Sequence, residues 1–183
     1  MKNRKRITEL SKWLSYVLRH HPQSAGLTLD SAGWISVDLL LAAANSNGQR
    51  TERSDLEEVV ASSDKQRFAL NTDRTQIRAN QGHSIPVDLQ LPVMVPPAIL
   101  FHGTAERFID SILCDGLRPR QRHHVHLSAD PKTAVSVGGR HGKPVVLHVD
   151  AARMHADGHV FRRSENGVWL AEHVPPTYLS WDG

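Results

Sequence analysis

The chain has 183 residues, 39% of them hydrophobic, and carries 22 Lys and Arg against 19 Asp and Glu, a formal net charge of +3. This length allows one domain or two small ones, and the basic balance is compatible with a polyanionic partner. A single cysteine, Cys114, excludes a disulfide framework and a Cys-rich metal cluster, and no apolar run approaches the ~20 residues of a membrane span.

The first predicted element is a helix that begins near the N-terminus. Its apolar residues recur at helical spacing: Ile7, Leu10, Leu14, Val17 and Leu18. Arg19, His20 and His21 follow them, and Pro22 stops the helix. Cations are favourable at a helix C-terminus, so this pattern alone is ordinary. The basic N-terminus is not followed by a hydrophobic signal region, and we expect a cytoplasmic protein.

Two further helices and a hairpin complete the first half. The second helix follows Ser36, and the third has Ser54 and Glu57 at the spacing of a capping box. Residues 67–79, "RFALNTDRTQIRA", alternate around a polar turn and predict a β-hairpin. Three helices followed by a hairpin are the outline of a winged helix-turn-helix.

Residues 86–97, "PVDLQLPVMVPP", carry four prolines and predict an extended linker. We therefore expect two lobes, residues 1–90 and 91–183. The second lobe mixes short strands (98–103, 124–128, 144–150 and 167–174) with short helices, which is typical of an α+β fold. Gly116 is expected to end one helix, and Asp130 and Pro131 are expected to begin the next.

The common nucleotide and hydrolase motifs (P-loop, GxGxxG, GxSxG, HExxH) are absent. Histidines at 123, 124 and 126 could indicate zinc. On a strand, however, His124 and His126 share one face while His123 points away, and no cysteine or obvious carboxylate accompanies them. We therefore expect no metal site.

Four arginines stand near the predicted ends of elements: Arg19, Arg67, Arg78 and Arg122. Histidines directly follow Arg19 and Arg122. The planar guanidinium group suits phosphate because it forms paired, charge-assisted hydrogen bonds. Each arginine alone is typical of a solvated surface residue. Together they favour a phosphate ligand.

Eight segments resemble, in order, those of the RNA 2'-phosphotransferase family of the NAD-dependent KptA type. They are "LSKWLSYVLRHHP", "GWISVDLLL", "SDKQRFAL", "IRANQGHS", "LFHGT", "RHHVHLSAD", "GRHGKPVVLHV" and "ENGVWL". The resemblance implies an RNA-binding winged-helix lobe and an NAD-binding lobe like that of ADP-ribosyltransferases, with the RNA phosphate held between them.

The reaction that the resemblance implies removes an internal 2'-phosphate from RNA in two steps. The phosphate first attacks C1 of the nicotinamide ribose of NAD and expels nicotinamide. The ribose 2-hydroxyl then attacks phosphorus, which gives 2'-OH RNA and ADP-ribose 1'',2''-cyclic phosphate. Eukaryotic members act in tRNA splicing, so a role in RNA processing is expected, with the physiological RNA left open.

The resemblance also assigns site residues. The family's Arg-His-Arg-Arg catalytic set corresponds to Arg19, His20, Arg67 and Arg122, with Arg140 as an alternative for the last. The residues expected to bind NAD are His102, Gly103, Thr104, His126, Ser128, Asp130, Thr133, Gly138 and Arg140. The residues expected to bind RNA phosphate are Arg78, Gln81 and His83.

One difference from ADP-ribosyltransferases that modify proteins bears on which group accepts the ADP-ribose. Relatives that modify proteins carry a catalytic Glu late in the NAD lobe, whereas here the matching strand reads "GVWL", with Glu172 only shortly after it. This favours phosphate as the acceptor. We expect a monomer without metal or membrane association, and two alternatives stay open: ADP-ribosylation of nucleic-acid phosphate ends, and a non-catalytic winged-helix nucleic-acid-binding protein.

Overall fold

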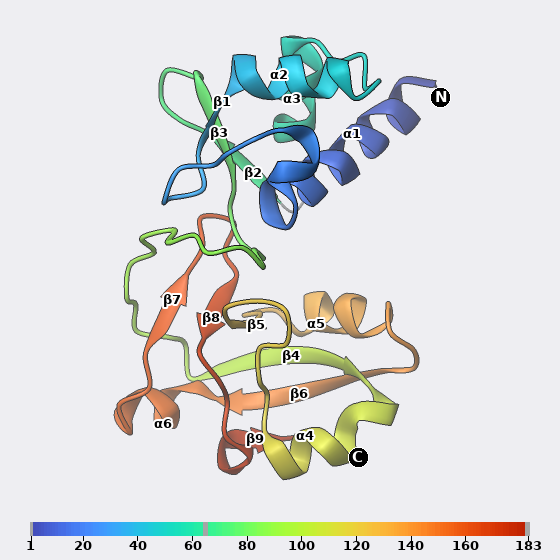
Figure 1. Cartoon of the computed structure of the whole chain (residues 1–183). Helices are drawn as coiled ribbons and strands as arrows, with labels where there is room; N and C mark the ends of the chain where they lie inside the picture. The colour runs from blue at the N-terminus through green and yellow to red at the C-terminus, as the bar shows by residue number, and fades with distance from the viewer. Residues whose placement is uncertain (1, 64–65, 182–183) are drawn as a thin grey trace. The chain divides into compact units, whose positions relative to one another are not determined.

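The computed structural model describes residues 2–63 and 66–181 (Figure 1). The chain divides into two compact units, Met1–Gln90 and Leu91–Gly183, and each has its own hydrophobic core. Helices and small antiparallel sheets occur in both units, which confirms the α+β class. The winged-helix and ADP-ribosyltransferase-like assignments stay predictions, as do the functions assigned to the two lobes.

The first unit contains the elements α1 (Lys2–Arg19), η1 (Pro22–Ala25), β1 (Ile35–Ser36), α2 (Val37–Ser46), α3 (Arg53–Ala61), β2 (Phe68–Leu70) and β3 (Gln76–Ala79). The strands form an antiparallel sheet in the order β1-β3-β2. β2 and β3 pair from Phe68↔Ala79 to Leu70↔Ile77, which confirms the predicted hairpin.

The apolar stripe of α1 faces the core of the first unit. Leu14, Val17 and Leu18 are fully buried, and Ile77 of β3 packs in the same cluster. The helix ends at Arg19, shortly before Pro22, the residue predicted to stop it. Burial of this stripe therefore sets the orientation of α1 in the first unit, and with it the position of Arg19 at the end of the helix.

The predicted capping box at Ser54 and Glu57 is wrong. α3 begins earlier, with Glu52 as its N-cap, and the Asp55 carboxylate accepts the backbone N–H of Glu52 at 3.0 Å. Asp55 is buried and paired with Arg6 of α1. Glu52 and Asp55 thus form the capping box of α3, the ion pair with Arg6 holds Asp55 in addition, and Ser54 lies inside the helix.

The second unit contains β4 (Ile99–Ala105), η2 (Glu106–Phe108), α4 (Ile109–Asp115), β5 (Val125–Leu127), α5 (Pro131–Gly138), β6 (Pro144–Asp150), α6 (Ala151–Ala156), β7 (Phe161–Arg163), β8 (Trp169–Ala171), η3 (Pro176–Tyr178) and β9 (Leu179–Ser180). Gly116 caps α4, and Asp130 and Pro131 begin α5, as predicted. The short elements η1, α6, β7, η3 and β9 were not predicted.

Two antiparallel sheets build the second unit, in the orders β4-β6-β9 and β5-β8-β7. They meet where Phe101 of β4 and Ser128, just after β5, exchange backbone hydrogen bonds of 2.8 Å. α5 lies along β4 (Figure 1). The candidate residues of this unit therefore gather around β4, β5 and α5.

Part of the predicted linker belongs to the second unit. Val93 pairs with Arg162 of β7, and the Arg162 side chain donates to the backbone oxygen of Leu91 at 2.6 Å. None of the helices in the described part of the chain has the length and apolar character needed to cross a membrane.

Candidate active site

The C-terminal end of α1 contacts the start of the hairpin. Nη2 of Arg19 donates to the backbone oxygen of Arg67 at 3.4 Å, and the Arg19 guanidinium lies 5.8 Å from the centre of the Phe68 ring. Asp64 and Lys65, which belong to the motif around Arg67, lie outside the described residues. The structure thus brings the side chain of Arg19 to the backbone of Arg67 within the first unit.

The chain that follows β3 binds both of these segments. The backbone N–H of Asn80 donates to the Arg67 oxygen at 3.0 Å, and that of Ser84 donates to the Arg19 oxygen at 2.9 Å. Oγ of Ser84 lies 2.9 Å from Nδ1 of His20. Arg19, His20 and Arg67 therefore form one hydrogen-bonded group with Asn80 and Ser84.

Sequence reasoning missed Asn80 and Ser84. Both lie in the segment "IRANQGHS", but Ser84 is 64 residues from its partner His20. No local spacing relates the two positions. Only the hairpin's return to the end of α1 could have identified them.

The residues assigned to RNA phosphate lie in the same region. The Arg78 guanidinium stacks on Trp34, 4.5 Å from the ring centre. His83 is 3% exposed and lies beside Gly33. Oε1 of Gln81 is a buried acceptor with no hydrogen-bond partner among the described residues. Their role toward RNA stays a prediction.

In the second unit, His102 on β4 is held by β5. Its Nδ1 lies 3.0 Å from the backbone oxygen of His126. A carbonyl oxygen only accepts, so Nδ1 carries the proton. Burial lowers the pKa of His102, while the hydrogen bond to the His126 oxygen acts in the opposite direction. A neutral His102 protonated at Nδ1 presents Nε2 as a hydrogen-bond acceptor.

Arg122 lies next to the same strand. Its Nη1 is 2.9 Å from Nδ1 of His126, and because a guanidinium only donates, Nδ1 of His126 is the acceptor. Partial burial, and then the positive charge of Arg140, lower the pKa of Arg122. Arg122 and Arg140, the two candidates for the last arginine of the catalytic set, are therefore close enough for their positive charges to interact. Their combined positive potential suits an anionic ligand.

Gly103 and Gly138 allow α5 to touch β4. A Cβ atom on Gly103 would lie 1.8 Å from the backbone oxygen of Ala134, and one on Gly138 would lie 2.4 Å from the backbone oxygen of Thr104. Thr104 is itself buried. Both glycines, assigned to NAD from sequence, thus have a packing role that the sequence prediction did not include.

Ser128, Asp130 and Thr133 build the N-terminus of α5. The Asp130 carboxylate accepts from the backbone N–H of Thr133 at 2.9 Å and from its hydroxyl at 2.7 Å. Oγ of Ser128 accepts the backbone N–H of Asp130 at 3.0 Å. The Thr133 hydrogen bonds lower the pKa of Asp130. These residues therefore hold the start of the helix that packs on β4.

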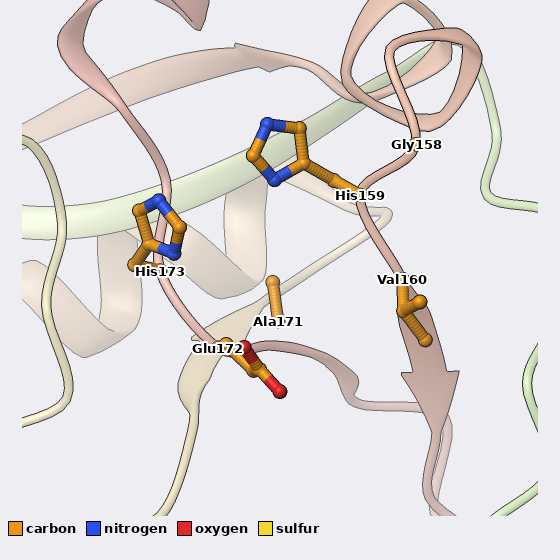
Figure 2. A pocket seen from close by; sticks show the side chains of 6 residues that line it. All are labelled: Gly158, His159, Val160, Ala171, Glu172 and His173. Atoms are coloured by element: carbon orange, nitrogen blue, oxygen red, sulfur yellow. The ribbon is translucent and has the colours of Figure 1, made fainter.

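Figure 2 shows a separate pocket at the ends of β7 and β8. It is lined by Gly158, His159, Val160, Ala171, Glu172 and His173. The rings of His159 and His173 lie edge to face, with centroids 5.5 Å apart. Glu172, the carboxylate nearest to the position used by protein-modifying relatives, is exposed here.

Among the residues that the structure describes, no group of His, Cys, Asp and Glu side chains is arranged to hold a metal ion. Apart from the helix cap of Asp130 and Thr133, the candidate polar side chains described above are arginine, histidine and serine in both units, with Asn80 and Gln81 in the first. Their chemistry is that of anion binding and proton transfer.

Residues 5–173 match the profile described as RNA 2'-phosphotransferase, Tpt1 / KptA family. Proteins named probable RNA 2'-phosphotransferase are 56% identical over 174 residues in Streptomyces coelicolor and 58% identical over 173 residues in Agrobacterium fabrum. These alignments cover 95% and 94% of this chain, and 94% and 93% of the relatives. One from Pseudomonas aeruginosa is 52% identical over 178 residues, 97% of this chain and 98% of the relative.

Proposed function

Because the chain belongs to the RNA 2'-phosphotransferase family, we propose that it transfers the 2'-phosphate of RNA to NAD, which is consumed as a co-substrate. One observation carries the proposal beyond the family: Arg19, His20 and Arg67 are held in a single hydrogen-bonded group. Arg67 joins this group through its backbone oxygen, and in the proposal its guanidinium, that of Arg19 and the His20 imidazole surround the reacting phosphate.

In this proposal Arg19 and Arg67 bind the RNA phosphate. A phosphate monoester is an anion at neutral pH and already a competent nucleophile. The first step therefore needs charge placement more than a general base. Arg122 supplies the fourth member of the family's catalytic set, and the positive charge of Arg140 acts on Arg122.

The second unit fits the NAD that the proposal requires. Nε2 of a neutral His102 can accept a hydrogen bond from a ribose hydroxyl. The positive charges of Arg122 and Arg140 suit the pyrophosphate. The proposal gives Gly103, Gly138 and the Ser128–Asp130–Thr133 cap an indirect part, because they hold β4 and α5 together.

The proposed chemistry conserves charge and protons without a metal. A phosphate oxygen bonds to C1 of the nicotinamide ribose as the bond to nicotinamide breaks. The ribose 2-hydroxyl then bonds to phosphorus as the bond to the RNA 2'-oxygen breaks. His20 takes the hydroxyl proton and returns a proton to the RNA oxygen, while the arginines neutralise the developing charge.

The decisive test incubates the purified protein with NAD and an oligonucleotide that carries one internal 2'-phosphate. The expected products are nicotinamide, RNA with a free 2'-hydroxyl, and ADP-ribose 1'',2''-cyclic phosphate, in equal amounts. RNA that ends as a stable ADP-ribosyl adduct would support end-modification instead. Binding of the RNA without nicotinamide release would support a non-catalytic binding protein.

A further inference from the structure

The segment Asn80–Ser84 makes hydrogen bonds to each of the candidate catalytic residues of the first unit. We propose that Asn80 and Ser84 are positioning residues: Ser84 orients the His20 imidazole, and Asn80 fixes the backbone that carries Arg67. This inference rests on the proposed function, which gives His20 and Arg67 their roles in the reaction.

Ser84 acts on the end of α1 through two atoms. Its backbone N–H donates to the Arg19 oxygen at 2.9 Å, and its Oγ lies 2.9 Å from Nδ1 of His20. An imidazole rotates about its side-chain bonds, and a hydrogen bond at one ring nitrogen limits this rotation. A hydroxyl can donate to or accept from that nitrogen, so the contact fixes the orientation of the ring and is compatible with either tautomer. Because the Ser84 contact occupies Nδ1, it leaves Nε2 as the nitrogen of His20 that can exchange a proton with the substrate.

The Ser84 hydroxyl does not need the contact with His20 in order to have a hydrogen-bond partner. Ser84 is exposed, and an exposed hydroxyl can bind water instead of a protein group. Loss of the hydroxyl is therefore expected to leave the stability of the unit nearly unchanged. An effect of its removal on the reaction would come through His20.

Asn80 acts on the start of the hairpin. It is 4% exposed, and its Nδ2 donates to the Gln66 oxygen at 2.7 Å while its backbone N–H donates to the Arg67 oxygen at 3.0 Å. Gln66 has a φ of 39°, a conformation that a residue other than glycine keeps only when its surroundings hold it. The hydrogen bond from Asn80 stabilises this conformation of Gln66, the residue immediately before Arg67.

The Arg67 carbonyl oxygen also links the two arginines. It accepts from Nη2 of Arg19 at 3.4 Å and from the Asn80 N–H at 3.0 Å, and a carbonyl oxygen has room for two donors. Displacement of the Arg67 peptide therefore removes an anchor of the Arg19 guanidinium. Asn80 thus controls the spacing of both phosphate-binding groups.

The chain offers a matched control for Ser84. Ser24 is also exposed, and its hydroxyl donates to the backbone oxygen of His21 at 2.7 Å. Ser24→Ala therefore removes an exposed hydroxyl close to the same helix end without a contact to His20. Ser84→Thr keeps the hydroxyl and is the conservative variant.

The experiment measures both chemical steps in single-turnover reactions of the full chain with NAD and 2'-phosphorylated RNA. In Ser84→Ala the second step is expected to slow by about 3–10-fold, the range of one lost hydrogen bond, and nicotinamide release by less than about twofold. ADP-ribosylated RNA should then accumulate. Ser84→Thr and Ser24→Ala should behave as wild type.

A second readout does not depend on turnover. The imidazole ¹⁵N shifts of His20, assigned by comparison with His20→Ala, report the state of Nδ1. They should change in Ser84→Ala and stay unchanged in Ser24→Ala.

For Asn80→Ala, we expect kcat/KM for the RNA to fall by about 3–10-fold with the KM for NAD unchanged.

Several outcomes would overturn the inference. The first is a folded Ser84→Ala protein with wild-type rates for both steps. The second is a set of His20 ¹⁵N shifts that does not change in Ser84→Ala. The third is equal slowing of both steps in Ser84→Ala, with the same slowing in Ser84→Thr. If Asn80→Ala does not fold, the Ser84 variants decide. A wild-type protein that releases no nicotinamide would instead refute the proposed function itself.

Discussion

Replacement of Gly138 by alanine is expected to force α5 away from β4. The new Cβ would lie 2.4 Å from the Thr104 oxygen and 3.1 Å from the Thr104 nitrogen, both backbone atoms of a strand paired along its full length with β6. Ordinary contact would require a separation greater by about 1 Å. Overpacking of this kind costs about 1–3 kcal/mol, and a rigid backbone on both sides favours the upper end.

Helix propensity acts in the opposite direction. Alanine is favoured over glycine inside a helix by about 1 kcal/mol, so a net loss of stability in Gly138→Ala can come only from the contact with β4. The adjacent Gly139 is the matched control. It has a φ of −60°, and its Cβ would approach nothing closer than the Val135 oxygen at 3.4 Å.

Scanning calorimetry of the full-length variants measures the difference. At the upper end of the overpacking cost, the net loss after the gain in helix propensity is about 2 kcal/mol, which lowers the melting temperature of a unit of this size by roughly 8–16 °C. Gly139→Ala should melt close to wild type. The reasoning would be refuted if Gly138→Ala melted at or above Gly139→Ala. If Gly138→Ala kept its stability but lost NAD binding alone, the glycine would serve the co-substrate directly.

Three further outcomes are expected. His20→Ala should slow the second chemical step by about 10²–10⁴-fold and let ADP-ribosylated RNA accumulate on a denaturing gel, whereas equal loss of both steps would assign His20 to phosphate placement. Arg67→Ala should fold but nearly lose 2'-phosphate removal, with weaker RNA binding of about 1.5–3 kcal/mol by titration; wild-type turnover would contradict the assignment. Hydrogen bonds from Thr133 lower the pKa of Asp130, so they stabilise the fold above the ordinary value of 3.8 and lose this effect as pH falls through the lowered pKa. Asp130→Asn should therefore show a smaller fall of melting temperature in acid, and an unchanged acid profile would count against the cap.

Local signals predicted the elements whose ends are encoded within a few residues. Pro22 follows the end of α1, Gly116 ends α4, and Asp130 with Pro131 begins α5. Each of these depends on backbone sterics or on a side chain bonded to its own helix. The sequence therefore places them without knowledge of the tertiary structure.

Tertiary contacts explain what was missed. The capping box of α3 uses Glu52 and Asp55 rather than the Ser and Glu of the usual pattern, and Asp55 is also held by Arg6, which lies 49 residues away. β7 and β9 are too short for a periodic pattern to be distinct, and pairing with β8 and β6 decides them. Such elements are defined by their neighbours rather than by their own residues.

The residues of the candidate site also fall into those that the sequence could identify and those that only the tertiary structure reveals. The sequence identified arginine and histidine side chains suited to phosphate, because residue type carries that chemistry. It could not identify Ser84 or Asn80, whose roles depend on the return of the hairpin to α1. It also assigned Gly103 to NAD alone, because the approach of α5 is visible only in three dimensions.

The wide sequence separation within the first-unit group has a consequence for biosynthesis. Contact between Arg19 and Arg67 spans 48 residues, and that between His20 and Ser84 spans 64. Contacts this distant form only after a large loop has closed, so they are late events in folding. On the ribosome, α1 can be complete while the group at its end cannot assemble until Ser84 has left the exit tunnel. A nascent chain shorter than this therefore contains Arg19 and His20 without Ser84, which contacts both of them.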